Sequence, residues 1–161
     1  MNISVTKQDG STVPFNADYI NKSIERACQG LPNIASYVTQ IASETQLTLY
    51  DRITTDELDQ ATINAALQNV SDDFRYDKIA TRLLLKTVYR VVPEYDKDDF
   101  ADLEKKHKDA FAPHIKSAIE KELLHSDMEK CFDLKKLAGA LDISRDEIFA
   151  YAGLSTFLHR Y

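Results

Sequence analysis

The N-terminal segment contains two short alternating runs of apolar and polar residues. One run covers Ile3–Lys7, the other covers Thr12–Phe15, and Asp9-Gly10 stands between them. An Asp-Gly pair between alternating runs predicts a β-hairpin with a type I′ turn, whose two central residues both need positive φ. Pro14 has no backbone N–H to donate, so we expect the second strand to lie at the edge of a sheet.

Helical periodicity dominates the next part of the chain. Asn16 is a good N-cap for a first helix, which Gly30 ends, and a second helix is expected to start near Asn33. Thr54 and Glu57 have the spacing of a capping box that opens a third helix through about residue 70. A fourth helix is expected over residues 76–91. The positions expected to be buried are Ile20, Ile24, Ala27, Cys28, Leu31, Ile34, Val38, Ile41, Tyr76, Ile79, Ala80, Leu83 and Thr87.

The order of elements indicates an α+β, mainly α fold. Leu47-Thr48-Leu49-Tyr50 is interpreted as a third short strand, which gives the order hairpin, helix, helix, strand, helix, helix. Val92-Pro93 breaks the helical pattern and a charged connector follows, so we expect a domain boundary between residues 1–92 and 93–161. Further helices are expected over residues 100–111 and 114–124. A final stretch, residues 132–161, contains Leu134, Leu137, Leu141, Ile148, Phe149, Leu154 and Phe157.

Composition narrows the function classes. The 161 residues are 43% hydrophobic and 29% charged, with a formal net charge of −6, which argues against generic nucleic-acid binding. No apolar run approaches the roughly 20 residues that span a bilayer, and no signal peptide is evident, so we expect a cytoplasmic protein without membrane contact. Cys28 and Cys131 form no CxxC pair, and both are expected to pack as small hydrophobes on helix faces.

The N-terminal module offers the groups that a triphosphate needs. Cations, free backbone N–H groups and a positive helix end must meet in one place. Lys7 precedes the hairpin turn, the second strand leads into the helix start at Asn16–Tyr19, and Thr55 begins the third helix. The fourth helix carries a basic stripe: Lys78, Arg82, Lys86 and Arg90. Each element has an ordinary alternative, since a turn lysine and a basic stripe are usually solvated and Thr55 could simply flank a cap.

The order of these residues resembles the ATP-cone family over about residues 1–92. The resemblance is carried by Val5-x-Lys7-x-Asp9-Gly10, Phe15-Asn16, Ile20, Thr54-Thr55, Ala80-x-Arg82-Leu83 and Arg90. It implies a small three-stranded sheet capping a four-helix bundle, with ATP or dATP bound as an allosteric effector and Mg²⁺ as a candidate companion ion. By resemblance, Asn16 helps to read the adenine, and Lys7 and Arg90 meet the phosphates. The implied contact positions are Lys7, Val13, Pro14, Phe15, Asn16, Ala17, Asp18, Tyr19, Ile20, Thr55 and Arg90.

Several residues depart from the family's pattern. Tyr19 stands where the family usually has a lysine, which removes one expected phosphate cation, and Lys22 lies about one helical turn further on. Gln8 replaces an arginine and Val13 replaces an acidic residue of some members. Asp59 and Thr87 occupy positions where some members carry histidine. Whether the site holds one nucleotide, two or none is therefore left open.

The last 30 or so residues are similar to the helical region that follows the cone in large subunits of aerobic-type ribonucleotide reductases. The similarity rests on Phe132-Asp133-Leu134, Leu137-Ala138, Ala140-Leu141-Asp142, Arg145-Asp146 and Phe149-x-Tyr151-x-Gly153-Leu154. It implies that the chain is the regulatory start of an enzyme that makes deoxyribonucleotides, with a radical-generating small subunit and other large subunits as partners. By resemblance, residues 1–161 carry no catalytic residue.

Two alternatives remain. The chain could be a degenerate cone that serves only as an oligomerisation surface. Residues 137–146 also superficially resemble a helix-turn-helix, with Ser144 capping a recognition helix. That helix would show Asp146 and Glu147 to DNA phosphates, which disfavours direct nucleic-acid binding.

Overall fold

The computed structural model describes residues 3–7, 9–90 and 103–160. The chain forms two compact units: the first comprises the chain up to Val88 together with the segment from Glu147 onward, and the second comprises Tyr89–Asp146. The domain boundary expected after Val92 falls outside the described residues and stays a prediction.

The predicted hairpin is present, with a different turn. Strands β1 (Ser4–Thr6) and β2 (Thr12–Pro14) pair antiparallel, and β2 lies at the edge of a sheet with the order β2-β1-β3, as expected from Pro14. The prediction of a type I′ turn is wrong. Gly10 has a φ of 81° and its N–H donates to the Lys7 carbonyl at 2.9 Å, while Asp9 is not among the residues with positive φ. Of the described loop residues Asp9 and Gly10, only Gly10 is therefore left-handed, as expected for a hairpin loop closed by glycine.

The third strand lies later than the sequence indicated. Helix α2 (Ile34–Leu47) continues into the residues interpreted as a strand, and its end is reinforced by Thr45, whose hydroxyl donates to the Ile41 carbonyl at 2.7 Å. Strand β3 consists only of Ile53–Thr54 and pairs parallel with β1. Arg52, with a φ of 64°, turns the chain into this position and donates its N–H to the Ser4 carbonyl.

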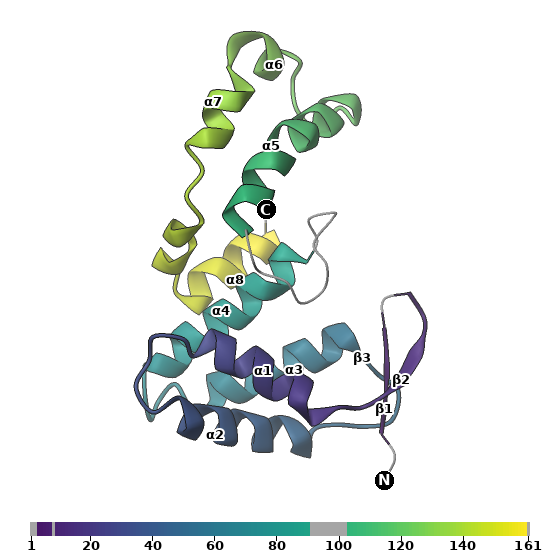
Figure 1. Cartoon of the computed structure of the whole chain (residues 1–161), viewed down its shortest axis with the longest axis vertical. Coiled ribbons are helices and arrows are strands. Elements are labelled where there is room, and N and C mark those ends of the chain that lie inside the picture. Colours follow the sequence, from purple (N-terminus) through teal and green to yellow (C-terminus); the bar gives the residue numbers. More distant parts are fainter. Residues whose placement is uncertain (1–2, 8, 91–102, 161) are drawn as a thin grey trace. The chain divides into compact units, whose positions relative to one another are not determined.

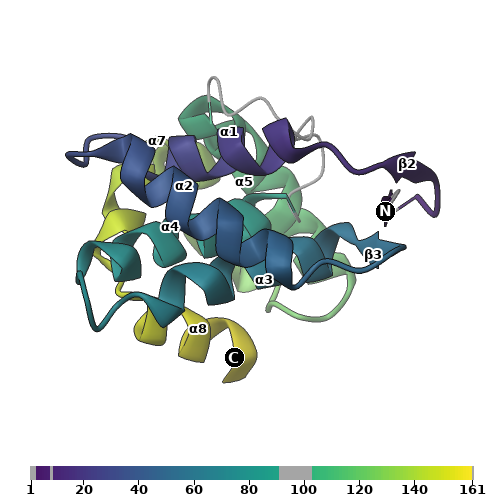
Figure 2. The same cartoon turned by 90° about the horizontal axis from the view of Figure 1, so that it is seen from below.

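Two other helices of the first unit begin where their capping residues indicated, and the fourth begins one residue before the expected position. Helix α1 (Ala17–Ala27) starts after Asn16, α3 (Thr55–Gln68) starts at a complete capping box, and α4 covers Arg75–Tyr89. Figures 1 and 2 both show the sheet at one end of α1, α2 and α3. The largest fully buried apolar side chains of this unit include Ile24, Ile41, Ile53, Ile63 and Ile79.

Some expected core positions of this unit are only half-buried. Leu31, Ile34, Val38 and Thr87 are in this group, and Tyr37 of α2 is buried although the sequence did not single it out. Cys28 is fully buried as expected.

The second unit contains one long helix where two were expected. Helix α5 covers Leu103–Glu120 and includes Pro113, so the proline between the two expected helices does not separate them, although its ring removes one backbone donor from the helix. Short helices α6 (Asp127–Cys131) and α7 (Leu134–Gly139) follow, and both contact α5. Cys131 is exposed, so the expectation that it packs on an apolar face is wrong.

The C-terminal stretch is less buried than its apolar pattern indicated. A 3₁₀ helix covers Ile143–Ile148 and α8 covers Tyr151–Arg160; Leu154 is buried, whereas the Ile148 side chain is 78% exposed. The segment that would be a recognition helix in a helix-turn-helix is thus a 3₁₀ helix. The Asp142 carboxylate accepts the backbone N–H of Ser144 at 3.1 Å. The capping side chain at this position is therefore Asp142, not Ser144.

Candidate functional site

The start of α1 is built by Asn16. Its side-chain oxygen accepts the backbone N–H of Asp18 at 2.9 Å, which satisfies one of the amides that would otherwise be free at the helix start. Ala17, Asp18 and Tyr19 form the first turn, and Ile20 anchors it in the core at 4% exposure. The positive end of the helix dipole therefore lies at the segment expected to hold a nucleotide, with Asp18 as an exposed acidic neighbour.

Lys7 and Thr55 lie together at the end of β1. Thr6 pairs with Thr54 in the parallel ladder, and the Thr55 hydroxyl donates to the Thr6 carbonyl at 3.3 Å. The backbone of Lys7 is fixed by its bond to the Ser11 carbonyl at 2.8 Å, and its side chain is exposed. The Thr55 hydroxyl, which was expected to contact a phosphate oxygen, donates to this backbone carbonyl instead.

The remaining predicted residues lie at the opposite end of β1. Val13 pairs with Val5, Pro14 pairs with Ser4, and Phe15 donates its N–H to the Ile3 carbonyl. At about 3.3 Å per residue, the four steps from Ile3 to Lys7 span about 13 Å. A ligand that touches both Asn16 and Lys7 must therefore be extended.

Arg90 is assigned to the second unit, which begins at Tyr89. Its predicted contact with phosphate therefore stays a prediction.

A charged cluster that the sequence did not identify lies among α1, α3 and α4. Lys86 Nζ lies 2.7 Å from Ser23 Oγ, 3.4 Å from Asp59 Oδ1 and 5.7 Å from the centre of the Tyr19 ring. The side chains of Lys86 and Asp59 are only 11% and 15% exposed. We call Lys86, Ser23, Asp59 and Tyr19 the Lys86 cluster. In the sequence, Lys86 belonged to the basic stripe, and Tyr19 and Asp59 stood out only as departures from the family's pattern.

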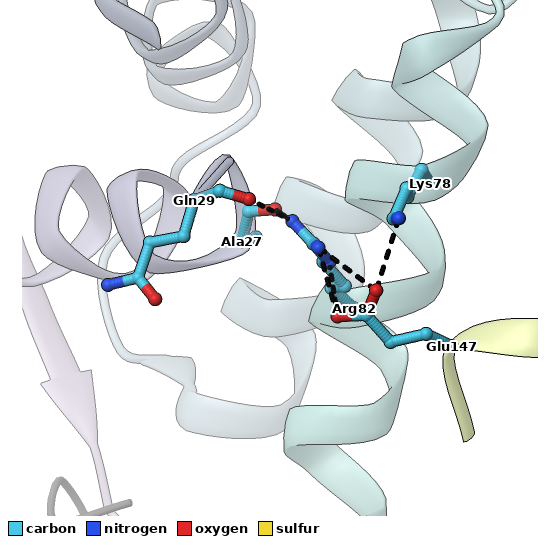
Figure 3. Close-up of polar contacts among 5 residues, drawn as sticks. All are labelled: Ala27, Gln29, Lys78, Arg82 and Glu147. Atoms are coloured by element: carbon cyan, nitrogen blue, oxygen red, sulfur yellow. Dashed lines mark hydrogen bonds and ion pairs between the residues drawn. The ribbon is translucent and has the colours of Figure 1, made fainter. Parts of the chain in front are cut away.

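The first part of the stripe binds another segment of the chain. Figure 3 shows the Arg82 guanidinium between two groups of acceptors: it donates to the carbonyls of Ala27 and Gln29 at 2.8 and 2.7 Å, and to the Glu147 carboxylate at 2.9 to 3.2 Å. Lys78 Nζ lies 3.1 Å from the same carboxylate. We call Arg82, Lys78 and Glu147 the Arg82 clasp. The interpretation of the stripe as a solvated face is wrong for Arg82, whose side chain is only 18% exposed, whereas Lys78 is 45% exposed and partly solvated.

A further polar contact joins α4 to the C-terminal segment beside the clasp. The Asp77 carboxylate accepts the backbone N–H of Tyr151 at 3.3 Å, which caps the start of α8. Leu154 of α8 is buried at 4% exposure. Residues after Glu147 therefore belong structurally to the unit that carries the candidate site.

This arrangement is a small helical module with a β-hairpin at one end, the architecture that the resemblance implied. The chain belongs to the ATP cone domain family, whose family model matches residues 3–91. Its relatives include the ribonucleoside-diphosphate reductase alpha subunits of Chlamydia trachomatis and Helicobacter pylori, 32% and 26% identical, and subunit alpha of ribonucleoside-diphosphate reductase 1 of Escherichia coli, 28% identical. Each alignment covers 99% of the chain, which spans only 15 to 20% of these relatives' length.

Two negative findings concern the part of the chain that the structure describes. None of its helices is both long and apolar enough to cross a membrane. Within the same residues, no group of three or more His, Cys, Asp or Glu side chains is placed to hold a metal ion.

Proposed function

We propose that this chain is the overall-activity regulatory region of a ribonucleoside-diphosphate reductase alpha subunit and binds ATP or dATP as an allosteric effector. The match of residues 3–91 to the ATP cone domain carries the proposal. The names of the relatives support the enzyme, and the capped start of α1 beside β2 supports an anion at that helix end. Asn16 reads the adenine, and Lys7 and Arg90 meet the phosphates.

The regulatory effect requires a difference in binding between two assembly states. ATP permits reduction of ribonucleotides by the parent enzyme, and dATP drives an inhibited oligomer of large subunits. An effector shifts such an equilibrium only as far as it binds one state more tightly than the other. Helices α1 and α4 flank the oligomer contact in this proposal, and the radical-generating small subunit is the enzyme's second partner in the cytoplasm.

Calorimetry of the 161-residue chain with ATP and with dATP tests the effector site. Lys7→Ala and Arg90→Ala are each expected to weaken binding about tenfold, because each removes a charged hydrogen-bond donor to phosphate. Lys105→Ala on α5 removes an equally exposed lysine and serves as the control. Binding of neither nucleotide would refute the effector proposal. Unchanged affinity in both variants would place the site elsewhere.

A specific observation favours a second candidate, the degenerate cone. Tyr19 replaces a lysine of the family's pattern, and Lys86 is already paired with Asp59. If the chain only forms an assembly surface, light scattering will show the same oligomer with and without dATP. A dATP-dependent change in mass would instead support regulation. Duplex DNA serves as a further titrant, and salt-dependent retention of DNA would favour the helix-turn-helix alternative.

A further inference from the structure

Two members of the Lys86 cluster, Ser23 and Asp59, lie one helical turn from predicted effector contacts. Tyr19 and Ser23 are four residues apart on α1, and Thr55 and Asp59 are four residues apart on α3. Residues at this spacing share a helix face. Ser23 and Asp59 therefore continue the helix faces that carry Tyr19 and Thr55, and Lys86 is the cation that α4 contributes beside them.

We propose that Lys86 is a phosphate-binding residue of the effector site and that Asp59 holds it when no nucleotide is bound. This inference rests on the proposed function. The Lys86 ammonium exchanges the Asp59 carboxylate for a phosphate oxygen of a nucleoside triphosphate. The four-carbon stem of a lysine can make such a move without a change in the helices, because its charge is compact and its donors rotate.

The geometry of the ion pair favours exchange. The closest approach of Lys86 Nζ to Asp59 is 3.4 Å, whereas its contact with the Ser23 hydroxyl is 2.7 Å. The salt bridge is therefore looser than the short N⁺–H···O⁻ bonds of about 2.7–2.9 Å found in optimised pairs.

The Tyr19 ring provides the link to the predicted site. Lys86 Nζ lies 5.7 Å from the ring centre, within the range of a cation–π interaction. Tyr19 is 39% exposed, so one ring contacts both the buried ammonium and the surface on which a nucleotide would lie. The position that lacks a lysine on α1 is thus contacted by a lysine from α4.

Opposite changes in affinity test the proposal. Asp59→Asn removes the competing carboxylate and its repulsion of phosphate, so we expect ATP to bind at least about threefold more tightly. Lys86→Met should weaken ATP binding about tenfold or more, in line with the loss of one charged donor. The loss should be smaller for AMP than for ATP, because AMP offers one phosphate instead of three.

Folding must be separated from binding, because Lys86→Met leaves Asp59 without its cation. The double variant Lys86→Met/Asp59→Asn contains no orphaned charge and is compared with Asp59→Asn alone, with thermal unfolding recorded for each. We expect the double variant to bind ATP about tenfold more weakly than Asp59→Asn. Equal affinities would overturn the role of Lys86, as would an Asp59→Asn variant that binds no more tightly than the unchanged chain.

Two further variants identify the cation. Lys105→Met removes an exposed lysine of the second unit and controls for the change in net charge. Lys22→Met tests the rival lysine on α1, and a tenfold loss there with none in Lys86→Met would overturn the proposal. If the unchanged chain and Asp59→Asn both bind no ATP, the effector function itself fails. If Lys7→Ala weakens binding while the Lys86 variants do not, only this inference fails.

Discussion

The Arg82 clasp makes a prediction with a defined sign and pH range. In Glu147→Gln, the carboxylate that accepts three contacts from Arg82 and one ion pair from Lys78 becomes a neutral amide. The Glu147 and Lys78 side chains are both 45% exposed, so their ion pair is worth only a few tenths of a kcal/mol. Arg82 is 18% exposed and binds bidentately, which adds about 0.5–1 kcal/mol. The expected loss in the free energy of unfolding is about 1 kcal/mol.

Protonation of Glu147 should abolish this difference. Burial raises the pKa of Glu147, but the contacts with Lys78 and Arg82 outweigh it and hold the pKa below its usual value of 4.5. A carboxyl whose pKa is lower in the folded state contributes stability that is complete above the unfolded value of about 4.5. That stability is lost as the pH falls through the lower folded value. The variant should therefore differ from the unchanged chain at pH 7 and approach it below pH 4.5.

Thermal unfolding followed by circular dichroism measures both effects. A loss of about 1 kcal/mol corresponds to a fall in Tm of roughly 2–4 °C for a chain of this size. Hydrogen exchange should also show reduced protection of the α8 amides, since the clasp holds the segment that leads into this helix. Glu120→Gln, an exposed position on α5, is the matched control. An equal fall in Tm at pH 7 and pH 3, or none at pH 7, would refute the assigned role of Glu147.

Two other predictions concern thiols and glycines. Burial raises the pKa of the Cys28 thiol to about 11, so at pH 8 a disulfide reagent should react rapidly with only the exposed Cys131 thiol of the folded chain. Cys131→Ser should remove this fast reaction, and two fast thiols in the unchanged chain would contradict the prediction. Gly10→Ala should lower the free energy of unfolding by about 1–2 kcal/mol, because Gly10 has a φ of 81°. In Gly153→Ala the added methyl group on α8 meets no atom within 4 Å, so the free energy of unfolding should rise by up to about 1 kcal/mol. The same change in the free energy of unfolding for both glycine variants would refute the argument.

Local signals predicted the starts of helices well. Asn16 and the pair Thr54 and Glu57 satisfy backbone groups within three residues of themselves, so their effect can be read from the adjacent sequence. Strand β3 could not be found in this way. Its two residues are in a strand only because β1 lies alongside, and the apolar residues at 47–50 gave a stronger but false local signal.

The partners of the basic stripe were beyond local prediction. Arg82 and Glu147 are 65 positions apart, and Lys86 and Asp59 are 27 apart. Four-residue spacing showed that the cations share one helix face, but it carries no information on which carboxylates approach that face. The candidate site was predicted as a set of residues on the basis of a resemblance. The partners of Lys86 could be found only from the way α1, α3 and α4 pack together.

In the basic stripe of α4, Lys78 and Arg82 pair with Glu147, whereas Lys86 pairs with Asp59. This difference determines which of these cations a bound effector can recruit. Arg82 is held by two backbone carbonyls at the end of α1 as well as by Glu147, so moving it would break its bonds to both carbonyls and leave Lys78 as the cation beside Glu147. Carbonyls left without a donor are costly when they are shielded from water. The contacts of Lys86 include a carboxylate at 3.4 Å and the Ser23 hydroxyl, and a phosphate could replace both. The net charge of −6 gives the chain no long-range attraction for a triphosphate, and the field of an exposed charge is screened over a Debye length of about 8 Å. Affinity for the effector must therefore come from cations within contact distance, and a lysine that lies over the Tyr19 ring is better suited to supply it than the clasped arginine one turn away.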